Sequence, residues 1–521
     1  MKNKRFLLLL ILSFLLLVLP NGFFTCFDKD EPKYLEAARE MIEKGDYITP
    51  YYNYEYRFDK PILVYWLIVL GYKLFGINEF GGGFFVSIFG VFTVLILYWW
   101  LRRWKSENLA FWSALTLLSM VYFVGMATVA MPDVVLLFFI TASLIFFFEG
   151  YHRKKEEFYL LAFASSGMAT LTKGPVGIVL PGIIAVVYLT LRRDLIRTLK
   201  EIPWIKGFTI FFLIVTPWYF AVLKKHGYHF FKDFVLFHNV HRFLSKVPGH
   251  PTQWWYYLAN YVWIYLPWSL VFPFAVYKAF KERKFITDNV IMFSVVWFFG
   301  VFTFFQIAHT KLTHYLLPSF PAFSVVVSWY LLNFEKRLVN YLIVLLLVIA
   351  SVVVTAAFTL KGFPPISYLL VAPTLLAAII LIFKKSNPLK IAVVFLILTS
   401  LSLKWIVLPS LQELRAKPQA GELIRDLAKN CQSCKFYFLH FRSPEVVYHF
   451  RTGKLENIHD FRKAEEMLKS EEPVVFVTRE NRLKNIKNTR FYLLFKKEEF
   501  LTKRKIVVIS NYPKEKLNAR E

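Results

Sequence analysis

The sequence predicts an all-α polytopic membrane domain, followed by a small extracytoplasmic α/β domain. Of the 521 residues, 56% are apolar and 19% are aromatic, whereas an ordinary soluble domain is roughly 45–50% apolar. Many apolar residues gather in runs close to the roughly 20 residues of a spanning helix. The net charge of +27 is concentrated in alternate connectors. This composition excludes a disordered chain and a disulfide-stapled mini-protein, and it argues against a large soluble enzyme.

The apolar runs predict about thirteen transmembrane helices, over residues 1–408. The first run, residues 6–24, follows a basic start, and we interpret it as an uncleaved span because no small-residue cleavage pattern follows it. The other runs lie near 81–101, 108–124, 132–150, 158–172, 175–191, 207–223, 258–280, 288–308, 313–333, 338–360, 366–383 and 391–408.

Basic residues occupy every second connector, which sets the predicted orientation. Clusters follow the runs that end near 101, 150, 191, 280, 333 and 383, and the intervening short loops hold at most one or two cations. This is the positive-inside pattern, and it places the N-terminus in the cytoplasm. The loops 25–80 and 224–257 and the tail from 409 then lie outside. The pattern accounts for much of the basic charge without a nucleic-acid partner.

The outer connectors hold the residues whose side chains are best suited to catalysis or ligand binding. Each has a structural explanation of its own: Asp30 could cap a helix, Asp133 could suit a helix N-terminus, and Lys173 could snorkel to the surface. Their occurrence on one face of the membrane favours a functional site instead. The set comprises Asp30, Glu31, Tyr34, Asp59, Lys60, Asp133, Lys173, His238, His241, Arg242, Lys311 and Tyr315.

Several short motifs in these connectors resemble, in the same order, those of a known family. They are Asp30-Glu31-Pro32-Lys33-Tyr34, Asp59-Lys60-Pro61, Leu171-Thr172-Lys173-Gly174-Pro175, His238-Asn239 with Arg242-Phe243, and Thr310-Lys311-Leu312 with Tyr315. The chain resembles GT-C-type membrane glycosyltransferases of the protein O-mannosyltransferase superfamily, most closely the bacterial lipid A aminoarabinose transferase branch. The resemblance covers residues 1–330.

The resemblance implies a sugar donor on undecaprenyl phosphate, used at the outer leaflet of the bacterial inner membrane. It implies that Asp30 and Asp133 are catalytic. Lys60 and Arg242 would hold the donor phosphate, and chemistry adds Lys311 and Lys173, because preorganised cations stabilise a phosphate leaving group. We further expect Glu31, Tyr34 and Tyr315 to contact substrate.

The resemblance also implies a divalent metal such as zinc, held by Asp59 and His238, with His241 as an alternative ligand. Two departures bear on this metal site: the closest relatives usually have Glu at the position of Asp59, and a second Pro is replaced by Ile62. The apolar stretch from Ile62 to Phe75 suits a groove for a polyprenyl tail.

The tail from 409 to 521 predicts a small α/β domain with a supporting or partner-binding role. A helix is expected over 421–430, and strands are expected over 436–441, 474–478, 490–495 and 505–510. Outside the cytoplasm Cys431 and Cys434 could form a local disulfide, with a redox pair or zinc site as weaker alternatives.

Other functions of the whole chain remain open at this stage. The acceptor could be a lipid A-type glycolipid, a protein hydroxyl or another envelope glycan. A lipid or glycan transporter is the non-enzyme alternative, although neither a clear repeat nor midplane charges support it.

Overall fold

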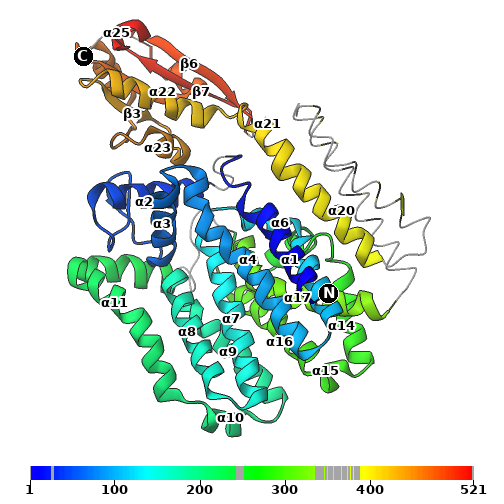
Figure 1. Cartoon of the computed structure of the whole chain (residues 1–521). Helices are drawn as coiled ribbons and strands as arrows, with labels where there is room; N and C mark the ends of the chain where they lie inside the picture. Colours follow the sequence, from blue (N-terminus) through cyan, green and yellow to red (C-terminus); the bar gives the residue numbers. More distant parts are fainter. Residues whose placement is uncertain are drawn as a thin grey trace. The chain divides into compact units, whose positions relative to one another are not determined.

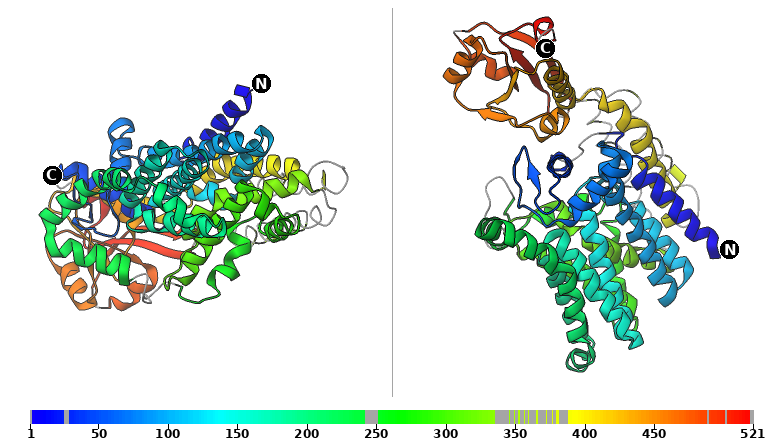
Figure 2. Two further views of the ribbon diagram at one scale, coloured as in Figure 1. Left: turned by 90° about the horizontal axis from the view of Figure 1, so that it is seen from below. Right: turned by 60° about the vertical axis from the view of Figure 1, so that its left-hand side comes forward.

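The computed structural model describes residues 2–24, 29–241, 251–334, 388–487, 489–500 and 502–518, with isolated positions between 345 and 380. The predicted spans at 338–360 and 366–383 lie outside this part, as do Cys26 and Arg242. The chain divides into two compact units, one of residues 1–21 and 58–407 and the other of residues 22–57 and 408–521. Figures 1 and 2 show the helices of the first unit and the sheet of the second.

The first unit consists of helices and their connecting loops and contains no strand among its described residues. Its elements are α1 (Lys2–Ser13), η1 (Phe14–Val18), α3 (Leu63–Phe75), α4 (Glu79–Trp104), α5 (Glu107–Leu118), α6 (Val121–Met126), α7 (Pro132–Arg153), α8 (Glu156–Lys173), α9 (Val176–Leu191), α10 (Leu195–Glu201), α11 (Trp204–Phe230), η2 (Phe231–His241), α13 (Tyr256–Ile264), α14 (Val271–Lys281), α15 (Lys284–Thr287), α16 (Asn289–Ile307), η3 (Thr313–Ser319), α17 (Phe320–Asn333), α20 (Pro388–Ser402) and η5 (Leu403–Val407).

Six helical segments among the described residues are long and apolar enough to cross a membrane. They are Glu79–Trp104, Pro132–Arg153, Trp204–Phe234, Asn289–Ile307, Thr313–Asn333 and Ala392–Gln412. The predicted polytopic helical domain is therefore confirmed, while the count of about thirteen spans stays a prediction.

Polar residues at the helix ends explain where several helices begin. The Asn78 side chain accepts a hydrogen bond from Gly81 N at 2.8 Å and starts α4. Ser106 does the same for α5 through Leu109 N, at 3.1 Å. The Asp288 carboxylate caps α16. Each cap satisfies a backbone N–H that has no partner inside its helix.

Small and polar side chains allow the helices to pack closely. A Cβ placed on Gly71 would lie 1.9 Å from the Gly81 carbonyl oxygen, so α3 approaches α4 at a glycine. Between α7 and α8, the Ser143 and Ser166 hydroxyls form a 2.9 Å hydrogen bond. Such contacts are typical of helices that associate without a hydrophobic driving force. They leave α7 buried along nearly all of its length.

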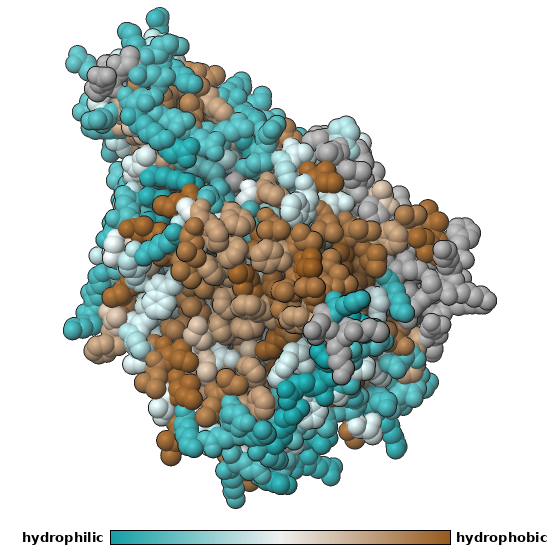
Figure 3. All heavy atoms as spheres, in the orientation of Figure 1, coloured by the Kyte–Doolittle hydropathy of each residue, from teal (hydrophilic) through white to brown (hydrophobic). Residues whose placement is uncertain are grey.

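Apolar side chains cover the middle of the first unit in a broad band. Figure 3 shows this band over the helices, with hydrophilic side chains gathered at the end where α10 and α15 lie. The basic connector Arg192–Lys200 belongs to that end. The arrangement agrees with basic residues that anchor one face of a membrane domain.

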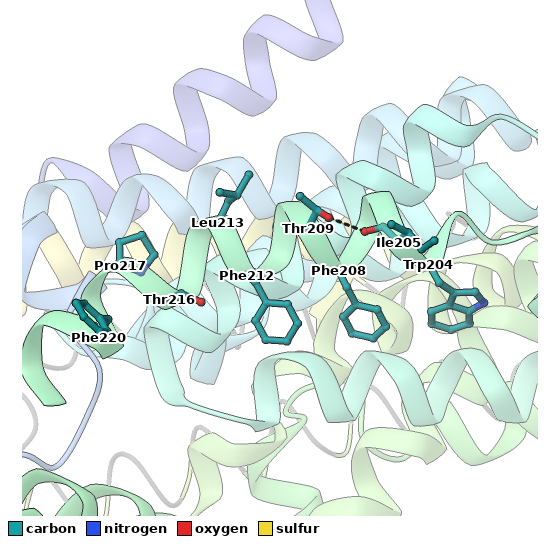
Figure 4. A pocket seen from close by; sticks show the side chains of 9 residues that line it. All are labelled: Trp204, Ile205, Phe208, Thr209, Phe212, Leu213, Thr216, Pro217 and Phe220. Atoms are coloured by element: carbon teal, nitrogen blue, oxygen red, sulfur yellow. Dashed lines mark hydrogen bonds between the residues drawn. The ribbon is translucent and has the colours of Figure 1, made fainter. Parts of the chain in front are cut away.

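Helix α11 exposes an apolar face, where an open groove of about 870 Å³ is lined by aromatic and aliphatic side chains. Trp204, Phe208 and Phe212 project from the same side of the helix (Figure 4). The Thr209 hydroxyl donates to the Ile205 carbonyl at 2.8 Å, so it adds no free polar group. A face of this kind suits contact with acyl chains.

The second unit contains the first outer loop and the C-terminal tail. Its elements are α2 (Glu31–Lys44), β1 (Tyr51–Tyr52), β2 (Glu55–Tyr56), α21 (Leu408–Gln412), α22 (Ala416–Asn430), β3 (Lys435–Leu439), α23 (Pro444–Phe450), β4 (Glu456–Ile458), α24 (Phe461–Lys469), β5 (Val474–Arg479), η6 (Glu480–Asn485), β6 (Tyr492–Glu499), β7 (Arg504–Ser510) and α25 (Lys514–Asn518). The predicted tail helix and four strands are confirmed, and β4, α23 and α24 are additions.

The tail folds around a five-stranded sheet in the order β4-β3-β5-β7-β6. Strands β4, β3 and β5 are parallel, while β7 is antiparallel to both of its neighbours. One apolar core contains Ile424 of α22 and Val446 of α23, and another contains Leu468 of α24. The α/β domain predicted for the tail is thus a two-sided sheet with its own cores.

Residues of the first outer loop are part of this unit although they lie far away in sequence. The Asn53 side chain accepts from Leu455 N at 2.8 Å and donates to Leu455 O at 3.0 Å. Lys454 forms an ion pair with Glu55 at 3.0 Å, and Tyr52 packs against the core of α22 and α23. The loop helix α2 is therefore fixed to the tail domain.

Candidate active site

Asp133 occupies the first turn of α7 and is 3% exposed. Met131 and Pro132 precede it, and a proline at this position presets the helical φ without removing a needed donor. The positive end of the helix dipole favours a carboxylate here. The sequence thus places a buried negative charge at a helix N-terminus.

Lys173 ends α8 beside this carboxylate. Its Nζ lies 2.5 Å from Asp133 Oδ1, and the side chains of Lys173 and Asp133 are 12% and 4% exposed. The Lys173 ammonium also lies 4.5 Å from the ring centre of Tyr315, in cation–π geometry. Because α7 and α8 form a helical hairpin, their connector at Lys154–Lys155 lies at the opposite end from this cluster.

An imidazole and a second ammonium group also face this carboxylate. His314 Nε2 is 3.9 Å from Asp133 Oδ1, and Lys60 interacts electrostatically with Asp133. The Lys60 ammonium donates to the Asp59 carbonyl oxygen at 2.8 Å. The structure therefore brings Lys60, Lys173 and Tyr315 together around Asp133, and it adds His314. The sequence signal for His314 was its place in the segment His309–Tyr315, beside Lys311 and Tyr315.

Lys311 lies in the same segment and is 3% exposed. Its Nζ donates to the Ala308 carbonyl at 2.5 Å, and burial lowers the pKa of its ammonium. The backbone around it is held by Tyr257, whose hydroxyl donates to the Leu312 carbonyl at 3.0 Å. Lys311 is thus a buried cation near the start of η3.

Asp30 belongs to the second unit and precedes α2. Its Oδ1 accepts a hydrogen bond from Lys33 Nζ at 2.6 Å. Partial burial acts to raise the pKa of Asp30, but the charges of Lys33, Arg57 and Lys29 outweigh it, and the pKa is lowered. Asp30 is therefore an ionised carboxylate at neutral pH, held by a lysine one helical turn away.

Glu31 and Tyr34 lie beside Asp30 and are largely buried. Glu31 is 7% exposed and Tyr34 is 4% exposed. The Arg57 guanidinium lies 4.9 Å from the ring centre of Tyr34. These contacts fix the first turns of α2, and their predicted role in substrate binding stays a prediction.

The predicted metal site falls mostly outside the described side chains. His238 lies in η2, but its side chain is not described, and Arg242 lies outside the described residues. Within the described part, no group of three or more His, Cys, Asp or Glu side chains is placed to hold a metal ion. Asp59 is half-buried in the loop before α3. The Asp59–His238 metal site remains a prediction.

The cysteine pair of the tail is joined. Cys431 and Cys434 form a disulfide across the turn between α22 and β3. This outcome matches the local disulfide that the sequence allowed.

Comparison with known proteins identifies the family. Residues 3–231 match the family model described as "Dolichyl-phosphate-mannose-protein mannosyltransferase". An uncharacterized protein of Aquifex aeolicus is 33% identical over 444 residues, which are 85% of this chain and 86% of that protein. The chain belongs to the protein mannosyltransferase family of GT-C membrane glycosyltransferases.

Other relatives agree with this assignment. The undecaprenyl phosphate-alpha-4-amino-4-deoxy-L-arabinose arabinosyl transferase of Aeromonas hydrophila is 27% identical over 305 residues, which are 57% of this chain and 55% of that protein. The crystal structure of ArnT from Cupriavidus metallidurans bound to undecaprenyl phosphate has the same fold, with a TM-score of 0.80, 20% identity and 99% of each chain covered. This mannosyltransferase-family protein is therefore a multi-pass bacterial inner-membrane enzyme of the GT-C fold.

Proposed function

We propose that this glycosyltransferase moves a sugar from a polyprenyl-phosphate donor to a lipid A-type glycolipid at the outer face of the inner membrane. The observation that carries the proposal is the cluster of Lys60, Lys173 and His314 around Asp133. A site in which two lysines and a histidine surround one carboxylate offers cationic and hydrogen-bonding groups to the phosphate of a donor. The structural relative with undecaprenyl phosphate bound supports a polyprenyl carrier.

The reaction breaks the bond between the sugar C1 and a phosphate oxygen. The electron pair of that bond goes to the phosphate, and an acceptor oxygen forms the new bond to C1. Lys60 and Lys173, with Lys311 and Arg242, would stabilise the charge that develops on the phosphate. The Asp133 carboxylate would fix the position of the Lys173 ammonium through their hydrogen bond. Its negative charge would also favour the protonated form of Lys173.

The role of Asp30 depends on the acceptor. If the acceptor is a hydroxyl, the Asp30 carboxylate would take its proton as the new bond forms. If the acceptor is a lipid A phosphate, that group is already largely ionised near neutral pH, because the second pKa of a phosphate monoester is about 6. Asp30 would then orient the acceptor or stabilise a cationic group. The lowered pKa of Asp30 keeps its carboxylate charged at neutral pH, as the second role requires, but it makes the carboxylate a weaker base for the first role.

Two acceptors have support among the relatives. The aminoarabinose transferase relatives favour a lipid A-type acceptor, and the family model is described as a protein mannosyltransferase. The resemblance across the whole chain is to ArnT. We therefore take the glycolipid as the acceptor and a protein hydroxyl as the second candidate.

The orientation and the metal are parts of the same proposal. The cytoplasmic N-terminus follows from the basic connectors, and the Cys431–Cys434 disulfide fits a tail outside the cytoplasm. Asp59 and His238 would hold a divalent ion such as zinc, which binds carboxylate oxygens and imidazole nitrogens. Bound there, the ion would supply a positive charge close to the donor phosphate.

The decisive experiment supplies the purified enzyme in liposomes with a panel of polyprenyl-phosphate sugars. Lipid A and an acceptor protein are offered in separate reactions, and the mass of each acceptor is measured. We expect lipid A to gain one sugar, with polyprenyl phosphate as the second product. A mass gain on the protein alone would favour the second candidate. Movement of unmodified glycolipid across the liposome membrane, with no sugar transferred, would contradict the proposal and favour a transporter.

A further inference from the structure

The C-terminal α/β unit brings imidazole and guanidinium groups to one edge of its sheet. His440 follows β3, His459 follows β4, and Arg479 ends β5. These three strands are parallel and adjacent, so their carboxyl ends meet at the same edge. In open α/β sheets this edge is where ligands bind.

A pocket of about 420 Å³ opens at this edge and is lined by His440, Phe441, Arg442, Asn457 and His459. Asn457 connects the loops after β3 and β4: its Oδ1 accepts from Phe441 N at 3.3 Å, and its Nδ2 lies 3.1 Å from His459 Nε2. The His440 ring stacks on Phe461 at a centroid distance of 4.3 Å. The lining residues are therefore held in place by their own contacts.

The polar groups of this pocket have capacity for a ligand. His440 Nε2 is buried and has no hydrogen-bond partner among the described residues. The same is true of Nε of Arg479, which is not a lining residue but lies over the ring of the lining residue Phe441. Buried polar atoms are normally hydrogen-bonded, so such groups require an explanation. Arg442 is exposed, and within the described part of the chain it forms no ion pair. A bound acceptor of hydrogen bonds would satisfy these donors.

Arg442 and Arg479 bring positive charge to this edge. Arg479 lies over the Phe441 ring at 5.4 Å, and burial, with repulsion from Arg504 and Arg482, lowers its pKa. The carboxylates of Asp460 and Glu480, which directly follow His459 and Arg479 in the sequence, interact with other groups. Asp460 caps α24 through Arg462 N at 2.9 Å, and Glu480 pairs with Lys496 at 2.5 Å.

We propose that this pocket binds the phosphate group of a phosphate monoester, carried either by a free small molecule or by a lipid headgroup. Guanidinium groups match phosphate oxygens with paired N–H donors. His440, Arg442 and His459 line the pocket, and Arg479 at the end of β5 lies over the ring of the lining residue Phe441, so the carboxyl ends of three adjacent strands bring imidazole and guanidinium donors to this edge. The site belongs to the tail unit, and its binding does not depend on the sugar transfer proposed above.

The test measures hydrogen–deuterium exchange of the full-length protein with and without inorganic phosphate. In parallel, vesicles that contain phosphatidic acid, a lipid with a phosphate monoester headgroup, are compared with vesicles of phosphatidylglycerol, a phosphodiester. We expect slower exchange in peptides that span residues 440–442 and 457–459. The Arg442→Ala variant should weaken the effect roughly tenfold in phosphate concentration, the loss of one charge-assisted hydrogen-bonding group. His440→Ala should weaken it as well.

Arg490→Ala is the matched control. Arg490 is exposed and lies just before β6. Tyr492, the first residue of β6, pairs with Ser510 of β7, and Ser510 in turn pairs with Val475 near the start of β5. The control therefore removes the same charge at the opposite edge of the sheet, and it should leave the protection unchanged. Lys60→Ala should also leave it unchanged, which separates this pocket from the proposed transfer site.

Protection by inorganic phosphate shows that the pocket accepts a phosphate group that is free in solution, and protection by phosphatidic acid vesicles alone identifies a lipid headgroup. The proposal is overturned if neither gives local protection, or if Arg490→Ala reduces the protection as much as Arg442→Ala. Equal protection by phosphatidylglycerol would also overturn it, because the pocket would then respond to negative charge in general.

Discussion

Lys173 and Asp133 form a buried ion pair, in which Lys173 Nζ lies 2.5 Å from Asp133 Oδ1 and joins the end of α8 to the start of α7. The two residues are 40 positions apart. Buried charges are costly unless they are paired. The ion pair therefore holds the Lys173 ammonium in one position, from which it would stabilise the negative charge that develops on a donor phosphate.

We expect Asp133→Asn to lower the transfer rate by at least roughly 100-fold, the scale seen when a preorganised electrostatic group is lost. It should also destabilise the protein by about 3 kcal/mol, because Lys173 is left as an uncompensated buried charge. Turnover of donor in liposomes and thermal unfolding in detergent measure the two effects.

The double variant Asp133→Asn with Lys173→Met separates stability from catalysis. It should recover part of the lost stability, since no buried charge remains unpaired, but it should not recover activity. Lys154→Met is the control, because Lys154 pairs with Glu201 at the exposed opposite end of the α7–α8 hairpin. Recovery of transfer in the double variant would show that the pair is only structural.

Lys33→Met should change the pH dependence of transfer through Asp30. Lys33 holds the pKa of Asp30 below its usual range, against the effect of partial burial. Without this lysine the pKa of Asp30 rises, so protonation occurs at higher pH and activity falls earlier on acidification. The acid limb of the pH–rate profile should therefore lie at higher pH in the variant than in the wild type. Lys44→Met, at the other end of α2, should leave the profile in place.

Much of the candidate site could be predicted from the sequence, because its residues belong to short motifs. Asp133, Lys173 and Tyr315 were all selected from the sequence, since charged and aromatic residues at helix ends on one face of a membrane are unusual. Their mutual distances were not predictable. They depend on which helices pair, and the Asp133–Lys173 contact follows from the α7–α8 hairpin, which apolar runs alone do not specify.

The association of the first outer loop with the tail could not be predicted from the sequence either. Asn53 and Leu455 are 402 positions apart, and hydrogen bonds over such a separation leave no local pattern. The two histidines His440 and His459 were missed for a related reason. Each is an ordinary loop residue, and only the parallel pairing of β3 with β4 brings them to the same pocket.

A buried glutamate predicts that the second unit is more stable at mildly acidic pH. Burial, together with the charge of Glu36, raises the pKa of Glu40 to about 8. Glu40 then holds its proton in the folded state at pH values where the unfolded chain has lost it. Its contribution to stability therefore falls as pH rises from the ordinary glutamate pKa of 4.5 towards about 8.

Glu40→Gln should remove this slope and raise stability at pH 8, because the amide can keep the hydrogen bond that Tyr54 N donates to Glu40 Oε2. Unfolding temperatures of both proteins from pH 5 to pH 8 measure the effect. Glu55→Gln, a change on the exposed hairpin of the same unit, is the control. If the Glu40→Gln variant and the wild type showed parallel curves, Glu40 would be charged in the folded state.

The disulfide predicts a specific pattern of thiol labelling. The chain has three cysteines, and Cys431 and Cys434 are bonded to each other. Alkylation of the denatured, unreduced protein should add one label, at Cys26, and alkylation after reduction should add three. The loop that the bond closes is short, so its loss through Cys431→Ser with Cys434→Ser should cost only about 2 kcal/mol by the chain-entropy estimate. Three labels without reduction, in protein purified from an oxidising compartment, would contradict both the bond and the extracytoplasmic tail.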